Sequence, residues 1–153
     1  MTNNENPWES YTETVLYFTP EPQVFIDLRK PVSAGVRDAL AEIGLSGEFS
    51  ILTAYNPHGR NLSDEENMRR LAELEAELAE SGELFVRVDA CSPDGSHCEA
   101  SFALRAPLSR AVDIADKWEQ LAVFWFDGRG FWIVGCELRT GERIQLPVLR
   151  ITD

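Results

Sequence analysis

The most informative part of the chain is FSILTAYNPHGRNLSDEEN, residues 49–67, where a strand pattern passes directly into a helix pattern. Residues 49–55 are mostly apolar, aromatic or β-branched, which is typical of a buried strand. Ser63 and Glu66 have the S-x-x-E spacing of a capping box, which marks the start of a helix. Gly82 stands where such a helix would end. We therefore predict a strand followed by a long helix that runs between these two caps.

Hydrophobic periodicity predicts further elements on both sides of this junction. Period-two alternation indicates strands, and apolar stripes at helical spacing indicate two more helices. The expected elements are strands at 14–19 and 23–28, a helix capped by Ser33 and ended by Gly44, strands at 84–90 and 99–105, a helix opened by Pro107 and Ser109, and strands at 122–126, 131–138 and 143–151.

From residue 49 onward the predicted order is strand, helix, strand, strand, helix, strand. This is the order of the split βαβ, or ferredoxin-like, arrangement. We therefore predict an α+β fold with a ferredoxin-like core over residues 49–126. The N-terminal strands and helix either extend the sheet or cover its second face. A C-terminal β-hairpin extension would pair beside the strand at 122–126 and remove its exposed edge.

The chain has 153 residues, which fits one domain with a sizeable core. We expect a flexible tail at residues 1–12, because the first residues are polar and acidic, and a single α+β domain at residues 13–153. No apolar run approaches the length of a transmembrane helix, and the N-terminus has no signal pattern. These features predict a cytoplasmic protein.

The composition is acidic, with 26 Asp and Glu against 14 Lys and Arg and a formal net charge of −12. Nucleic acids and anionic membranes attract basic surfaces, so we expect neither as a partner. The charge permits a basic protein partner, although acidity that simply maintains solubility is the plainer interpretation.

The chain contains three cysteines, Cys91, Cys98 and Cys136. With no secretory signal, we expect reduced thiols. The spacing of Cys91, His97 and Cys98 matches no standard zinc motif, so we predict neither a metal site nor a cofactor, and a redox or metal role of these three residues stays open. Cys136 is interpreted as a small core residue on an aromatic strand.

The split βαβ topology would bring two loops to the same end of the sheet, namely residues 56–62 and the hairpin at 91–98. The first and second strands of this topology run in the same direction, and the third strand neighbours the first. Polar residues about 35 positions apart would therefore meet. We predict a ligand site at this edge, and its candidate residues are Asn56, His58, Arg60, Asn61, Asn67, Asp94, His97 and Glu99.

Asn67 lies in the first turn of the predicted long helix, on the same face as the leucine stripe. A polar side chain on a buried face needs hydrogen-bond partners, so Asn67 either ties down the loop at 56–62 or contacts a ligand directly. Free N–H groups at the helix start favour a small anionic or polar ligand, whereas the acids of the first turn repel an anion. Further along, Glu66 and Arg70 have the spacing of an i,i+4 ion pair.

Several short motifs occur in the order of a known family. They are TAYNP at 53–57, LSDEEN at 62–67, SPDG at 92–95 and EASF at 99–102. Over about residues 49–135 the chain resembles the bacterial "domain of unknown function 3293" family. The resemblance implies a bacterial cytosolic protein without an established activity. In that family an aromatic residue often precedes the glutamate that matches Glu99, and a proline follows it; Cys98 and Ala100 occupy these places here.

Three classes of function remain open. The first is a small cytosolic binding or regulatory module with a polar two-loop site at a helix N-terminus. The second is a small hydrolase-like enzyme in which His58 or His97 works with Asp94 or Glu99 in general acid–base catalysis. The third is an acidic protein-interaction module. The sequence has no nucleophile elbow, phosphate-binding loop or dinucleotide fingerprint, so its catalytic residues are unknown.

Overall fold

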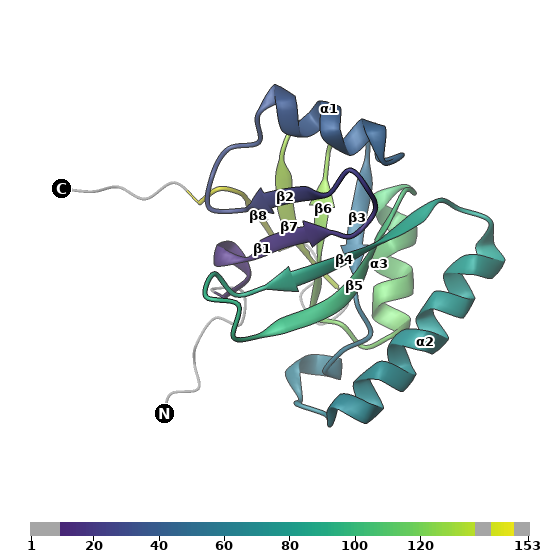
Figure 1. The fold of residues 1–153 in the computed structure, drawn as a ribbon. Helices are drawn as coiled ribbons and strands as arrows, with labels where there is room; N and C mark the ends of the chain where they lie inside the picture. Colours follow the sequence, from purple (N-terminus) through teal and green to yellow (C-terminus); the bar gives the residue numbers. More distant parts are fainter. Residues whose placement is uncertain (1–9, 137–141, 149–153) are drawn as a thin grey trace.

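The computed structural model describes residues 10–136 and 142–148, which form three α-helices and one eight-stranded antiparallel sheet (Figure 1). Among the described helices, none is long and apolar enough to cross a membrane. The elements are η1 (Ser10–Glu13), β1 (Val15–Phe18), β2 (Val24–Asp27), α1 (Ala34–Glu42), β3 (Phe49–Leu52), η2 (Pro57–Gly59), α2 (Asp64–Ser81), β4 (Phe85–Cys91), β5 (Cys98–Leu104), α3 (Leu108–Lys117), β6 (Ala122–Phe126), β7 (Phe131–Gly135) and β8 (Arg143–Gln145), where η denotes a short 3-10 helix.

The sheet has the strand order β2-β1-β4-β5-β3-β6-β7-β8. In its centre β5 pairs antiparallel with both β3 and β4, so β3 and β4 run in the same direction. The loop after β3 and the hairpin between β4 and β5 consequently lie at the same end of the sheet. The predicted α+β class is confirmed, and so is the placement of these two loops.

Helix α2 begins and ends where the capping pattern predicts. The Ser63 hydroxyl accepts a hydrogen bond from the Glu66 N–H at 3.1 Å, and the Glu66 carboxylate accepts one from the Ser63 N–H at 3.3 Å. Gly82 closes the helix in the left-handed conformation, at φ 77°, which glycine adopts without steric cost.

We expect Ser63→Ala to lower the free energy of unfolding by about 0.5–2 kcal/mol, because the first turn of α2 loses its side-chain acceptor. Urea unfolding would measure the change. Ser109→Ala is the matched control, since Ser109 is exposed in the first turn of α3 but does not occupy the N-cap position. Equal effects of the two substitutions would contradict a capping role.

The outer face of the sheet is covered by α2 and α3, which Figure 1 shows on one side of the strands. Leu71, Leu74 and Leu78 of α2 pack in the same apolar cluster as Ala111 and Ile114 of α3. The apolar stripes of these two helices therefore pack on the same face of the sheet.

Residues from both ends of the strand order meet in one apolar cluster on the inner face. Ile26 of β2, Ile133 of β7 and Leu146, which follows β8, belong to this cluster together with Leu40 of α1 and Phe49 of β3. Distant strands share neighbours only if the sheet curls, so the inner face is concave. The N-terminal strands thus extend the sheet and also, together with α1, cover its second face.

Three strands, β3, β7 and β8, end at least three residues earlier than predicted. β3 stops at Leu52 because the Thr53 hydroxyl accepts the Tyr55 N–H at 3.1 Å and turns the chain. β8 stops at Gln145, two residues before Pro147, which has no N–H to donate to a ladder. The predicted ends of the last two strands, at 137–138 and 149–151, lie outside the described residues.

Tyr11 lies within the stretch 1–12 that we expect to be a tail. In the structure it belongs to η1, and its ring packs against Phe124 with 5.9 Å between ring centroids. The packed part of the chain therefore starts before residue 13, because a large aromatic ring gains burial against the inner face. Residues 1–9 lie outside the described residues.

Ser50 is completely buried in β3, and among the described residues its hydroxyl has no hydrogen-bond partner. We expect Ser50→Ala to raise the free energy of unfolding by about 1 kcal/mol, because an unpaired hydroxyl loses its hydration without compensation. Ser101→Ala should have the opposite sign, since the equally buried Ser101 hydroxyl donates to the Glu99 carbonyl at 3.1 Å. Thermal and urea unfolding of both variants would test the contrast. A lower free energy of unfolding in both variants would contradict an unpaired hydroxyl at Ser50.

Candidate functional site

The two loops at this end of the sheet are joined by a hydrogen bond. The side-chain amide of Asn56, in the loop after β3, donates to a carboxylate oxygen of Glu99 in β5 at 3.2 Å. Asn56 adopts the left-handed backbone conformation, at φ 44°, which asparagine tolerates better than most residues. The predicted contact between the loops is therefore confirmed.

Asn67 holds the first of these loops in place. Its side chain is 3% exposed, its oxygen accepts the Asn56 N–H at 2.9 Å, and its nitrogen donates to the Asn56 side-chain oxygen at 2.9 Å. That Asn56 oxygen also accepts the Leu62 N–H at 3.0 Å. The interpretation that Asn67 ties down the loop is confirmed, and its amide faces Asn56.

Arg70 anchors this end of the fold, and its predicted ion pair with Glu66 is wrong. Its guanidinium donates to the Ala54 carbonyl at 2.7 Å and to the Trp118 carbonyl at 2.8 Å, and it lies 5.3 Å from the centre of the Trp118 ring. The predicted ion pair with Glu66 is absent among the described residues because Glu66 caps its own helix. The three-residue spacing from Asn67 was the available signal, since it places both side chains on one helix face.

Gln120 was also missed by sequence reasoning. Its side-chain nitrogen donates to the Tyr55 carbonyl at 3.0 Å and to the Trp118 carbonyl at 3.1 Å, which anchors the end of α3 to the chain after β3. Gln120 is buried and directly precedes β6. No local motif distinguishes such a glutamine from an exposed one.

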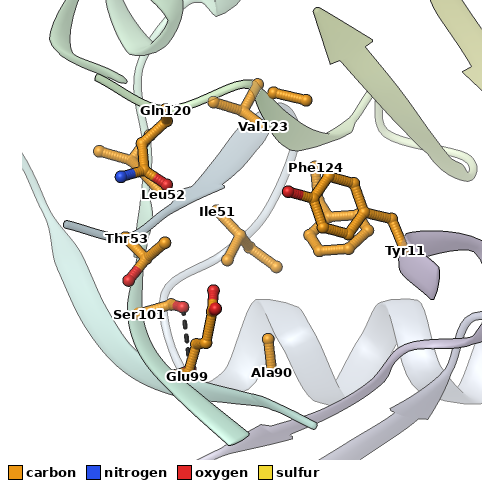
Figure 2. A pocket seen from close by; sticks show the side chains of 11 residues that line it. Tyr11, Ile51, Leu52, Thr53, Ala90, Glu99, Ser101, Gln120, Val123 and Phe124 are labelled. Carbon is orange, nitrogen blue, oxygen red and sulfur yellow. Dashed lines mark hydrogen bonds between the residues drawn. The ribbon is translucent and has the colours of Figure 1, made fainter. Parts of the chain in front are cut away.

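A cavity of about 40 Å³ lies on the concave face at this end of the sheet. Figure 2 shows the Glu99 carboxylate pointing toward its middle and Tyr11 closing one side against Phe124. A wider depression of about 180 Å³ shares the four residues Tyr11, Ala90, Glu99 and Phe124 and adds His97. The cavity itself is lined by Tyr11, Ile51, Leu52, Thr53, Ala90, Glu99, Ser101, Gln120, Ala122, Val123 and Phe124.

His97 lies beside the same carboxylate, with its ring nitrogen Nε2 3.3 Å from a Glu99 oxygen. The imidazole is mostly exposed and lines the wider depression. His58 is exposed in η2 and is not among the residues that line either hollow. The structure thus pairs one of the two candidate histidines with a carboxylate.

Among the eight predicted site residues, Glu99 lines the cavity, His97 lines the wider depression, and Asn56 and Asn67 belong to the loop network; the role of the other four in binding stays a prediction. Besides His58, they are Arg60, whose side chain donates to the Pro57 carbonyl at 3.4 Å, the exposed Asn61, and Asp94. Asp94 sits in the predicted turn at 92–95, where the Gly95 N–H bonds to the Ser92 carbonyl.

The Asp94 carboxylate organises its own turn. It accepts hydrogen bonds from the Ser96 N–H at 3.0 Å and from the Ser96 and Ser92 hydroxyls at 2.8 Å each. These bonds, those from Ser96 first, lower the pKa of Asp94 to about 2. Asp94 therefore shapes the hairpin, and its hydrogen bonds to described side chains stay within that turn.

A pH titration should show this directly. Because the pKa of folded Asp94 lies below the unfolded value, its stabilisation of the turn is complete above about pH 4 and is lost as the pH falls through about 2. In NMR spectra recorded at decreasing pH, we expect the Ser96 amide resonance to shift with a midpoint at about pH 2. Asp94→Asn should abolish the transition, and a midpoint near pH 4 would contradict the hydrogen-bonded turn.

The cysteines differ from the prediction of reduced thiols. Cys91 and Cys98 form a disulfide because they face each other directly across the β4–β5 hairpin, a register that their spacing alone does not reveal. Cys136 is buried as predicted, and burial raises the pKa of its thiol to about 12. No group of three or more metal-ligating side chains occurs among the residues that the structure describes.

These features describe a small α+β protein with a partly polar cavity at the mouth of a curled sheet. Residues 52–123 match the model of a family described as "Protein of unknown function (DUF3293)". The match covers just under half of the chain and confirms the resemblance seen in the sequence motifs. Comparison with curated proteins and with solved structures gave no significant match. The matched region includes Asn56, Asn67, Glu99 and Gln120, so the loop network lies within it.

Proposed function

We propose that this protein is a small-molecule-binding module whose site is the cavity on the concave face of the sheet. The observation that carries the proposal is Glu99, whose carboxylate points into the cavity while Asn56 holds it from the neighbouring loop. A carboxylate that is only about one quarter exposed, at 27%, loses much of its hydration and gains from a polar partner. Apolar walls and a few fixed polar groups are the usual composition of ligand pockets.

The cavity alone admits only a small group. A single water needs roughly 10–15 Å³ of comparable volume, so about 40 Å³ holds about three water-sized groups. The wider depression beside it offers space for the rest of a ligand. A ligand of a few non-hydrogen atoms that enters through the depression fits both hollows.

Native mass spectrometry combined with a fragment screen by NMR tests this proposal. We expect Ala90→Leu to abolish binding, since the Ala90 side chain lies in the lining of both hollows and a larger one fills them. Ala72→Leu on the exposed surface of α2 is the matched control and should bind as the wild type does. Binding that survives Ala90→Leu would place the site elsewhere.

One observation supports an enzyme as the second candidate. The His97 imidazole lies 3.3 Å from the Glu99 carboxylate, an arrangement in which the carboxylate can orient the ring of a general base. A hydrolase that uses this pair would lose its turnover of an activated ester in His97→Gln but keep it in His58→Gln. Equal turnover in both variants would exclude this pair as the catalytic base.

We also infer a ferredoxin-like unit over residues 49–126 and a cytoplasmic location. The order β4-β5-β3-β6, with α2 and α3 on one face, supports the first inference. The acidic composition supports the second, although a cytoplasmic setting would favour the reduced form of Cys91 and Cys98. Thiol labelling of cell extracts under acid quench would report which form occurs.

A further inference from the structure

Three polar side chains of the cavity lining, those of Gln120, Thr53 and Ser101, direct their hydrogen-bond donors to backbone carbonyls. Gln120 is the clearest case, because two carbonyl oxygens, of Tyr55 and Trp118, lie within 3.1 Å of its side-chain nitrogen. Both amide hydrogens are used there. Figure 2 shows the side-chain oxygen of Gln120 on the side of the cavity, so this residue offers the cavity an acceptor.

Thr53 and Ser101, whose aliphatic hydroxyls also belong to the lining, show the same pattern. Thr53 donates its hydroxyl hydrogen to the Ala100 carbonyl at 2.7 Å, and Ser101 donates its own to the Glu99 carbonyl at 3.1 Å. A hydroxyl has one hydrogen and two lone pairs, so each retains acceptor capacity only. The backbone thereby fixes the direction in which both groups can bond a ligand.

Glu99 adds a charge to these acceptors. Its oxygen Oε2 is bonded by Asn56 and lies beside His97, whereas its second oxygen makes no hydrogen bond among the described residues. Neither lysine nor arginine is among the described residues that line the cavity. The lining therefore disfavours a carboxylate or a phosphate and favours a ligand rich in N–H donors.

We propose that the cavity binds the primary ammonium group of a small amine. This inference rests on the proposed function and names the ligand class of the same site. The ammonium group can donate to the second oxygen of Glu99, and the acceptors of Gln120 and Ser101 belong to the same lining, as do the rings of Tyr11 and Phe124. The carbon chain of the amine lies toward the wider depression, which Phe124 also lines.

An NMR titration with three isosteric probes tests the ligand class. The probes are n-butylamine, which is protonated at neutral pH, 1-butanol and butyrate. We expect n-butylamine to shift the amide resonances of residues 99–101 and 120–124 and to bind at least about tenfold more tightly than 1-butanol. Butyrate should produce no saturable shift.

Glu99→Gln isolates the charge while keeping an oxygen for the Asn56 amide. We expect this substitution to lower the affinity for n-butylamine about tenfold or more and to change the affinity for 1-butanol by less than about threefold. Glu99→Asp retains the charge and should keep most of the preference for the amine. Glu75→Gln, on the exposed surface of α2, is the control and should leave the affinity for both probes unchanged.

The outcomes separate the two proposals. Equal affinity for n-butylamine and 1-butanol, with both lost in Ala90→Leu, would overturn the ammonium assignment and leave a binding cavity. Absence of saturable shifts at the cavity with all three probes and with the fragment screen would overturn the proposed function itself. Butyrate binding more tightly than n-butylamine would also overturn the ammonium assignment, because a carboxylate ligand needs hydrogen-bond donors in the lining.

Discussion

Replacing Arg70 by methionine should lower the free energy of unfolding by about 2–4 kcal/mol, the largest effect that we expect from a single side chain at this site. The guanidinium donates to the carbonyl oxygens of Ala54 and Trp118 and lies on the Trp118 ring. The Trp118 carbonyl would keep its bond from Gln120, whereas the Ala54 carbonyl would lose a charged donor at a fully buried residue. Urea unfolding followed by circular dichroism would measure the loss.

Arg69 provides a matched control on the same helix. Its side chain is 64% exposed and pairs with Glu73 at 3.9 Å, so Arg69→Met should change stability by less than about 0.5 kcal/mol. Arg70→Lys should give an intermediate loss, because a single ammonium group cannot reproduce the planar fork that bonds both carbonyls. Equal losses at positions 69 and 70 would show that helix propensity, and not the inward guanidinium, sets the effect.

Local chemistry was sufficient to predict the parts of the fold that depend on neighbouring residues. The capping box of Ser63 and Glu66 specifies the start of α2, since both partners lie within one helical turn. The order of strands and helices specified which loops meet, and the bond between Asn56 and Glu99 confirms it. Because a buried side-chain amide needs hydrogen-bond partners, the position of Asn67 on the apolar stripe predicted that its amide would be hydrogen-bonded.

Contacts between distant segments were not predictable in the same way. Tyr11 reaches Phe124 across more than a hundred residues, and nothing in its own neighbourhood indicates a packed ring. Gln120 faces the chain after β3 because of where α3 ends, which depends on packing between layers. The Cys91–Cys98 disulfide depends on the register of a hairpin, and a shift of one residue would separate the two sulfur atoms.

The second large effect concerns Asn67. We expect Asn67→Leu to lower the free energy of unfolding by about 1–3 kcal/mol, although leucine is similar in size and more apolar. The loss arises because the Asn56 N–H loses its acceptor and the Asn56 side-chain oxygen loses one of its two donors. Urea unfolding would measure the change. Asn61→Leu, at an exposed position of the same loop, should cost less than about 0.5 kcal/mol.

The same substitution should weaken binding at the cavity without touching its lining. Asn56 orients the Glu99 carboxylate, and Asn67 in turn orients Asn56, so the loss of Asn67 releases the carboxylate from its fixed position. We expect the Glu99 amide resonance to shift in Asn67→Leu and the affinity for n-butylamine to fall, while Ala72→Leu on the exposed surface of α2 changes neither. If Asn67→Leu destabilises the protein but leaves both the Glu99 resonance and the affinity unchanged, the loop network stabilises the fold and does not position the site.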